Sequence, residues 1–289
     1  MDNFDPSYTP NHDDGMLRYC YKNQPTIIWW NLVRFGEALG EIMGIGANVD
    51  SEEFISGGVK EEQEQEVISR AEKLIMQAGE EYKATFLAQY KKLMAARLGI
   101  RNFKDSDFDE LFSEGLDTME ALELDFNHFF RRLSNLDLAS IATPEARKAK
   151  ASVFFHKEGP PKFVGESDAR DRIAKWLEAW RARIIEDWSD NGESLSESKD
   201  GERIAAMKQV NPNFVPRGWI LDEVIRRVEK EGERDVLDRI MHMALNPFED
   251  TWAGKTLAGV EYTGDAEEEQ RWVADVPRME RAMQCSCSS

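Results

Sequence analysis

Apolar residues recur at helical spacing along most of this chain. After Pro25 they predict a buried helix that continues to about Met43. The clearest pattern predicts a second core-facing helix from the candidate N-cap Ser167 to about Trp188. The apolar positions of these two helices are Ile28, Leu32, Phe35 and Leu39 in the first, and Ile173, Trp176, Leu177, Trp180, Ile184, Ile185 and Trp188 in the second.

The same periodicity predicts helices elsewhere in the chain. Two are expected between Glu61 and about Leu98, separated near Gly79. Others are expected at 105–122, 125–133, 144–155, 219–230 and 234–245. No segment shows convincing alternation of period two, so the predicted fold class is mostly α.

Proline, glycine and acidic residues separate these helices. Three prolines in the first 25 residues predict a loop, and the stretch 44–58 is interpreted as a connection. Residues 189–202 are expected to form an exposed loop. An acidic tail is expected to follow the last helix.

Charge narrows the range of partners. The 289 residues contain 55 Asp and Glu against 37 Lys and Arg, a formal net charge of −18. Such a chain repels polyanions, so neither nucleic acid nor an anionic membrane is expected as a partner, although Arg131 and Arg132 could form a local basic patch. No apolar run approaches the length of a membrane span, and three cysteines are too few for a secreted disulfide framework.

Candidate chemistry is sparse. The glycines between 36 and 46 lack the preceding strand that a phosphate-binding loop needs, and the four histidines are not at zinc-ligand spacing. No catalytic, cofactor-binding or metal-ligating residue is therefore predicted in this chain. Cys285 and Cys287 are redox candidates as an exposed thiol pair, and an unimportant polar tail is the alternative.

Several short motifs occur in order along the chain. They are Phe4-Asp5-Pro6, Asn11-His12-Asp13-Asp14, Arg18-Tyr19, Asn23-Gln24-Pro25, Trp30-Asn31-Leu32, Trp176-Leu177 with Trp180 and Arg181, Val210-Asn211-Pro212 with Val215, Arg217, Ile220 and Ile225, and Cys287-Ser288-Ser289. Together they closely resemble the selenoprotein O family of kinase-like protein adenylyltransferases. The motifs from Phe4 to Leu32 resemble the segment that follows that family's metal-binding motif. Pro216 and Gly218 differ from the residues that are usual in the family.

This resemblance implies a fold and an activity. The chain would be the C-terminal part of an enzyme that uses ATP and magnesium to transfer AMP to Ser, Thr or Tyr hydroxyls of other proteins. The family's nucleotide- and metal-binding residues precede the segment that resembles Met1, so this chain alone is expected to be inactive. Residues 1–25 would form an activation-segment-like loop, 26–165 the lower C-lobe helices of a protein-kinase-like fold, 166–270 a family-specific helical extension, and 271–289 a tail with the C-x-C pair.

The resemblance also implies a site and a location. Asn11, His12, Asp13 and Arg18 would border the active site and help to place the acceptor. Eukaryotic family members imply a mitochondrial location, with a transit peptide outside this chain and the cytoplasm as the alternative. The C-terminal cysteines could meet a redox partner. A non-catalytic helical interaction or scaffold module is the rival function.

Overall fold

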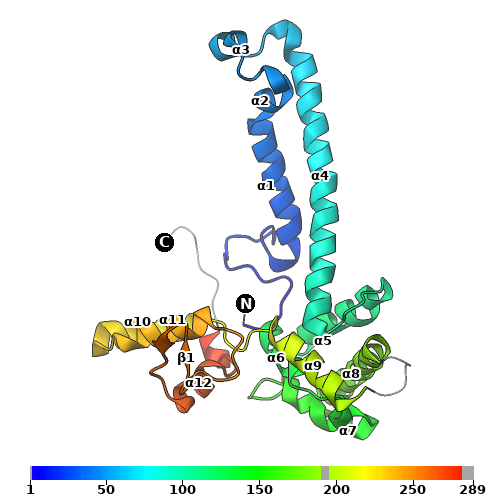
Figure 1. Ribbon diagram of the computed structural model, residues 1–289, viewed down its shortest axis with the longest axis vertical. Coiled ribbons are helices and arrows are strands. Elements are labelled where there is room, and N and C mark those ends of the chain that lie inside the picture. The colour runs from blue at the N-terminus through cyan, green and yellow to red at the C-terminus, as the bar shows by residue number, and fades with distance from the viewer. Residues whose placement is uncertain (1, 190–194, 282–289) are drawn as a thin grey trace. The chain divides into compact units, whose positions relative to one another are not determined.

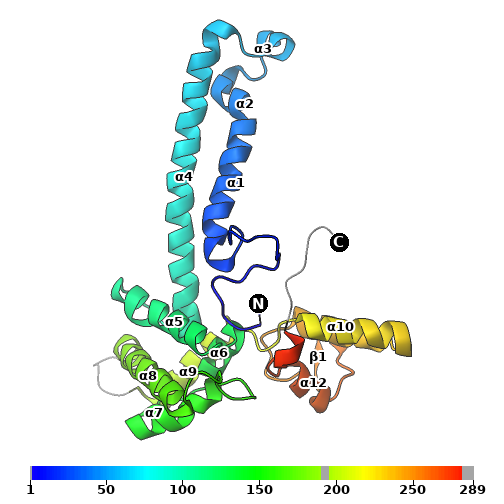
Figure 2. The same ribbon diagram turned by 180° about the vertical axis from the view of Figure 1, so that it is seen from behind.

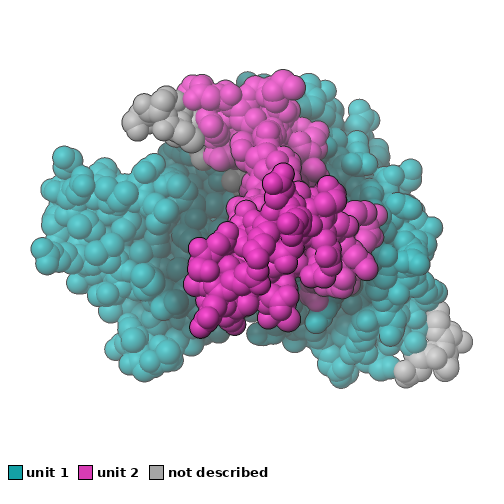
Figure 3. Space-filling view, turned by 90° about the horizontal axis from the view of Figure 1, so that it is seen from above, with its two compact units in different colours: residues 1–5, 91–283 teal, residues 6–90, 284–289 magenta. Residues whose placement is uncertain are grey.

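The computed structural model describes residues 2–189 and 195–281, and they are predominantly helical. Twelve α-helices and one two-stranded antiparallel sheet lie within these residues, so the predicted mostly α class is confirmed. The described residues fall into two compact units, distinguished by colour in Figure 3. Unit 1 contains residues 2–5 and 91–281, and unit 2 contains residues 6–90. Along the described residues, no helix combines the length and the apolar content that a membrane crossing requires.

Unit 2 is a loop followed by a helical hairpin. Helices α1 and α2 run beside the long helix α4 in both ribbon views (Figure 1, Figure 2). The loop ends at a 3-10 turn, η1, and a proline in the first turn of α1 suits the start of a helix because proline has no N–H to leave unpaired. The elements are η1 (Tyr21–Asn23), α1 (Gln24–Ala38), α2 (Gly40–Ile45), η2 (Gly46–Asn48), α3 (Glu52–Gly57) and α4 (Glu61–Leu98), which continues into unit 1.

Small residues bring the two arms of the hairpin close together. An ideal Cβ on Gly36 would lie 2.9 Å from Cγ1 of Ile75, and one on Gly44 would lie 2.2 Å from the carbonyl oxygen of Val67. No side chain can be accommodated at that second distance. Glycine at these positions therefore sets how closely α1 and α2 approach α4.

Helix α4 corrects one prediction from the sequence. It is continuous through Gly79, where a break was expected, because an isolated glycine weakens a helix without ending it. The space left by the missing side chain is taken by the indole of Trp29, which lies 2.7 Å from an ideal Cβ at that position. The connection at 44–58 likewise contains α3, a helix that was not predicted.

The apolar stripe of α1 corrects a second prediction. Ile28, Leu32 and Phe35 are 46%, 44% and 62% exposed, although their spacing predicts a buried helix. Gly36 is the buried residue of α1, because α1 turns Gly36 and Trp29 toward α4, and neither belongs to the predicted stripe. The spacing of apolar residues identifies an apolar face of a helix, but it does not show whether another element covers that face.

Unit 1 is built around α8, whose apolar stripe is buried as predicted. Ile173, Trp180 and Ile184 are fully buried, and Trp176 is 5% exposed. The indole N–H groups of Trp176 and Trp180 donate to the carbonyl oxygens of Leu111 and Leu98 at 3.0 Å and 2.9 Å. The elements around this core are η3 (Phe108–Ser113), α5 (Glu114–Ala121), α6 (Phe126–Ser134), η4 (Ala139–Ile141), α7 (Pro144–Lys150), η5 (Ala151–Phe154), α8 (Glu166–Trp188) and α9 (Glu197–Lys208).

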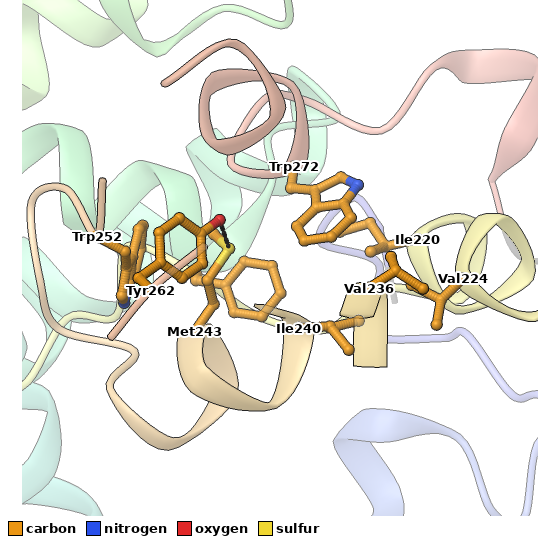
Figure 4. Close-up of a cluster of buried hydrophobic side chains, with 9 residues drawn as sticks. Ile220, Val224, Val236, Ile240, Met243, Trp252, Tyr262 and Trp272 are labelled. Carbon is orange, nitrogen blue, oxygen red and sulfur yellow. Dashed lines mark hydrogen bonds between the residues drawn. The ribbon is translucent and has the colours of Figure 1, made fainter. Parts of the chain in front are cut away.

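A second apolar cluster holds the last part of unit 1 together (Figure 4). The hydroxyl of Tyr262 lies 3.3 Å from the sulfur of Met243, inside a cluster that also contains Trp252 and Trp272. The contributing elements are α10 (Gly218–Arg226), η6 (Arg227–Glu231), α11 (Asp235–Leu245), β1 (Thr256–Leu257), β2 (Val260–Glu261) and α12 (Ala266–Trp272), followed by η7 (Arg278–Glu280). In the sheet, Thr256 pairs with Glu261.

Several local predictions in unit 1 are wrong. Helix α9 begins at Glu197, inside the stretch 189–202 that was expected to be a loop, because Ser196 caps it by accepting from the N–H of Lys199. Helix α8 begins at Glu166 after Gly165, so Ser167 is not its N-cap. The helix expected at 105–122 is present, and it consists of a π-helical segment, η3, followed by α5.

Candidate functional site

The loop predicted to border an active site lies in unit 2 and is held together by its own side chains. The carboxylate of Asp14 accepts hydrogen bonds from the backbone N–H groups of Arg18 and Tyr19 at 2.9 Å and 2.8 Å. The N–H of Asp13 donates to Oδ1 of Asn11 at 3.0 Å. Short polar side chains that bond to nearby backbone favour tight turns over helix, which explains why this sequence folds as a loop.

Arg18 joins this loop to helix α1. Its guanidinium carbon lies 4.3 Å from the centre of the Trp30 ring, and that of Arg34 lies 5.5 Å from the same ring. A cation over an indole at these distances is a favourable electrostatic contact. Arg18 and Trp30 therefore form a half-exposed platform beside the loop.

The predicted site residues are close neighbours, and most of them face water. His12 and Asp13 are exposed, with Nε2 of His12 3.1 Å from Oδ1 of Asp13. The arrangement offers one cation, one imidazole and one carboxylate to a visiting chain. No group of three or more His, Cys, Asp or Glu that could hold a metal ion occurs among the described residues.

The cysteines divide between described and undescribed parts of the chain. Cys20 is completely buried in the loop and is a free thiol. Cys285 and Cys287 lie outside the described residues, so their redox role remains a prediction from the sequence.

A buried charge cluster in unit 1 was not predicted from the sequence. The carboxylate of Asp275 accepts from Nδ1 of His128 at 2.8 Å, from Nη2 of Arg132 at 2.7 Å and from the N–H of Lys157 at 2.8 Å. Burial opposes ionisation of this carboxyl and would raise its pKa, but the hydrogen bonds from His128 and Lys157 and the charge of Arg132 outweigh burial and lower the pKa of Asp275 well below its usual range. The sequence offered little indication of this cluster, because Asp275 lies in the segment 271–289, which was predicted to be a tail.

The suggested basic patch at Arg131 and Arg132 is also wrong. Arg131 is 3% exposed and reaches the carbonyl oxygen of Asn211 at 3.0 Å and the carboxylate of Asp250 at 2.6 Å. Burial lowers the pKa of Arg131, partly offset by Asp250 and Glu249. Both arginines serve to join α6 to later segments of unit 1, and they present no cationic surface.

Comparison with known proteins identifies the family. The family model described as "Protein adenylyltransferase SelO" matches residues 1–245. The chain is 29% identical over 344 residues to "Protein adenylyltransferase SelO, mitochondrial" of Saccharomyces cerevisiae, and 30% identical over 300 residues to the protein of the same name of Schizosaccharomyces pombe. It is also 29% identical over 250 residues to "Protein nucleotidyltransferase YdiU" of Rhizobium johnstonii.

The matches cover most of this chain but only part of each relative. All of this chain is matched by the two yeast proteins, and 86% of it by the bacterial one. The chain spans 48%, 47% and 40% of those three proteins, about half their length or less. Because the family model covers 245 of 289 residues, the chain belongs to the SelO family of protein adenylyltransferases.

Proposed function

We propose that this chain is the C-terminal, helical part of an enzyme that transfers AMP from ATP to Ser, Thr or Tyr hydroxyls of other proteins. The observation that carries the proposal is the match of the SelO family model to residues 1–245. The names of the relatives, adenylyltransferase and nucleotidyltransferase, support the reaction class. The C-terminal placement, like the kinase-like lobe assignment, rests on the resemblance of residues 4–32 to the segment after the family's metal-binding motif.

ATP and magnesium belong to the proposal only for the whole family protein. The described residues do not fit these groups, because they contain no cluster of three or more candidate metal ligands and the sequence has no phosphate-binding loop. We therefore assign no step of the nucleotide chemistry to the side chains of residues 2–189 or 195–281, and we expect this chain alone to be inactive.

The role that we propose for this chain at the active site of the whole protein is to position the acceptor protein. Asn11, His12, Asp13 and Arg18 lie in a loop whose backbone is fixed by Asp14, and a fixed loop orders a partner at a lower entropic cost than a free one. Arg18 can pair with an acidic residue of the acceptor without losing its contact with Trp30.

Transfer of labelled AMP tests the activity. The chain of residues 1–289 and a longer polypeptide obtained by extending its reading frame upstream would be incubated with ATP labelled on the α-phosphate, magnesium and a general protein acceptor. We expect label on protein with the longer polypeptide only. Calorimetry of the shorter chain with ATP and magnesium should show no binding, and micromolar binding would contradict the assignment.

A matched pair of variants in the longer polypeptide tests the role of the loop. Arg18→Ala should raise KM for the protein acceptor at least fivefold and leave KM for ATP unchanged. Arg34→Ala, which also removes a cation from the Trp30 ring, is the control and should change neither value. An equal effect of the two variants would contradict acceptor placement by Arg18.

A non-catalytic interaction module is the second candidate function. The exposed apolar stripe of Ile28, Leu32 and Phe35 favours it, since such a face is typical of a surface that binds another protein. An upstream reading frame that encodes a Gly-rich loop and a Lys would favour the enzyme. A reading frame without either would favour the module.

We also propose a mitochondrial location and a redox partner for the C-terminal cysteines. The location is supported by the names of the two yeast relatives, both of which are described as mitochondrial. Import of the full-length protein into isolated mitochondria would test it, with protection from added protease as the expected result. No described residue bears on the redox partner.

A further inference from the structure

An acidic apolar groove runs along one side of the unit 2 hairpin, and its function is not explained by adenylyl transfer. It has a volume of about 970 Å³ and lies between α1–α2 and the first half of α4. In both ribbon views these arms are neighbours over this length (Figure 1, Figure 2). The lining residues are Val33, Glu37, Gly40, Glu41, Val59, Glu61, Glu64, Val67, Ile68, Ala71, Glu72, Ile75 and Met76.

The floor of the groove is the line along which the two arms touch. Val67 and Ala71 are 5% exposed and face the glycines of the opposite arm, so the floor is closed. The wall is open to water: Ile68 is 41% exposed and Met76 is 73% exposed. Large apolar side chains that line a groove and remain this accessible are typical of a surface that a partner covers.

The charge on the lining has a single sign. Five glutamates line the groove, and no lysine or arginine occurs among its described lining residues. Glu37 lies 2.7 Å from Nη1 of Arg34, whereas no ion pair to Glu41, Glu61, Glu64 or Glu72 occurs among the described residues. An apolar floor between glutamates is complementary to a chain with an apolar stripe flanked by cations.

The length of the groove sets the form of that chain. From Glu61 to Met76 the groove follows α4 for four turns, or about 22 Å at the usual helical rise. A partner helix of similar length could lay its apolar face along such a furrow, as amphipathic helices do in hydrophobic grooves.

We propose that this groove binds a basic amphipathic helix of another protein. Apolar side chains of the partner contact Val33, Ile68 and Met76, and its lysines or arginines pair with Glu64 and Glu72. The proposal is independent of the transfer of AMP, because none of these residues belongs to the loop assigned to acceptor placement.

Fluorescence anisotropy with the chain of residues 1–289 tests this. The probe is a labelled 18-residue peptide of leucine and lysine, with the leucines on one helical face. We expect saturable binding that weakens at high salt. A peptide with glutamate in place of every lysine should not bind, and one with the same composition but leucines spread around the helix should bind at least tenfold more weakly.

Matched variants distinguish the groove from the general acidity of the chain. Glu64→Lys with Glu72→Lys should weaken binding at least tenfold, whereas Asp50→Lys with Glu62→Lys, which changes the net charge equally outside the groove, should change it less than twofold. Ile68→Ser with Met76→Ser should weaken binding at least fivefold, and Ile55→Ser, a change at another exposed apolar residue of unit 2, should not. Circular dichroism would verify that each variant retains its helix content.

Two outcomes would overturn the proposal. Equal weakening by both charge-changing pairs would show attraction to the acidic chain as a whole. Concentration-dependent dimerisation in sedimentation analysis, abolished by the Ile68 and Met76 changes and accompanied by no peptide binding, would assign the groove to a second copy of this chain.

Discussion

The carbonyl oxygen of Val67 occupies the space in which Gly44 would carry a side chain, 2.2 Å from an ideal Cβ. Backbone of a helix cannot move aside as a flexible side chain can, so Gly44→Ala must push α2 away from α4. We expect a loss of about 2–3 kcal/mol in the free energy of unfolding, in the range of other overpacking changes, measured by urea denaturation.

Gly57→Ala is the matched control in the same unit, because no atom lies within 4 Å of its ideal Cβ. Its stability should stay within about 0.5 kcal/mol of the original chain. Equal losses in the two variants would show that glycine at position 44 is not needed for helix packing.

Trp180 is fully buried on α8 and donates to the carbonyl oxygen of Leu98 at 2.9 Å. Trp180→Ala should lower the free energy of unfolding by about 3–5 kcal/mol, because it opens a cavity and leaves a buried acceptor unpaired. Phe163→Ala removes an aromatic ring that is 76% exposed and should cost less than about 0.5 kcal/mol. A change below about 1 kcal/mol at Trp180 would contradict the core assignment.

The lowered pKa of Asp275 predicts a specific dependence of stability on pH. A carboxyl whose pKa is lower in the folded than in the unfolded chain contributes stability above its unfolded pKa, and loses it as the pH falls through the folded value. Asp275→Asn should therefore cost about 3–5 kcal/mol at pH 7, since Arg132 keeps its partly buried position without a counter-charge and His128 loses its carboxylate partner.

Below pH 4, the difference between Asp275→Asn and the original chain should shrink. Urea denaturation at pH 7 and at pH 3 would measure both values. Asp222→Asn, a change at an exposed residue of α10, is the control and should show no comparable loss. A difference that stays constant between the two pH values would refute a charged role for Asp275.

Cys20 should react slowly with alkylating reagents in the native protein, because it is completely buried. From the sequence, Cys285 and Cys287 are predicted to react faster, because a terminal segment with serines around the thiols offers no apolar neighbours to bury them. Mass spectrometry of the alkylated native chain would give the three rates. Faster labelling of Cys20 than of either C-terminal cysteine would contradict this order.

The sequence correctly predicted features that depend on neighbouring residues, such as helices. It did not predict features that depend on residues far apart in the chain, such as which helix face is covered. The stripe of α8 and the first turn of α1 follow from local spacing and from Pro25, and both are confirmed. The exposure of Phe35 could not be predicted, because periodicity does not reveal that Gly36 faces the opposite arm.

Ion-pair partners that lie far apart in the sequence explain the other predictions that were wrong. Arg131 and Arg132 suggested a surface patch, but their carboxylates, Asp250 and Asp275, come more than a hundred residues later. The site loop shows the opposite case. The loop was expected from the prolines in the first 25 residues. The protein that this loop would contact depends on the partner and cannot be predicted from these residues.

The aromatic cluster of unit 1 has a consequence for where this polypeptide can be shortened. The SelO family model ends at residue 245, whereas Trp252, Tyr262 and Trp272 complete the same core as Phe214 and Ile220. A fragment that ended at residue 245 would expose the hydrophobic side of α10 and α11 to water. The end of the family model is therefore not the end of the folded core, and a fragment that keeps the buried residues of unit 1 must extend through Val276, which is itself 2% exposed.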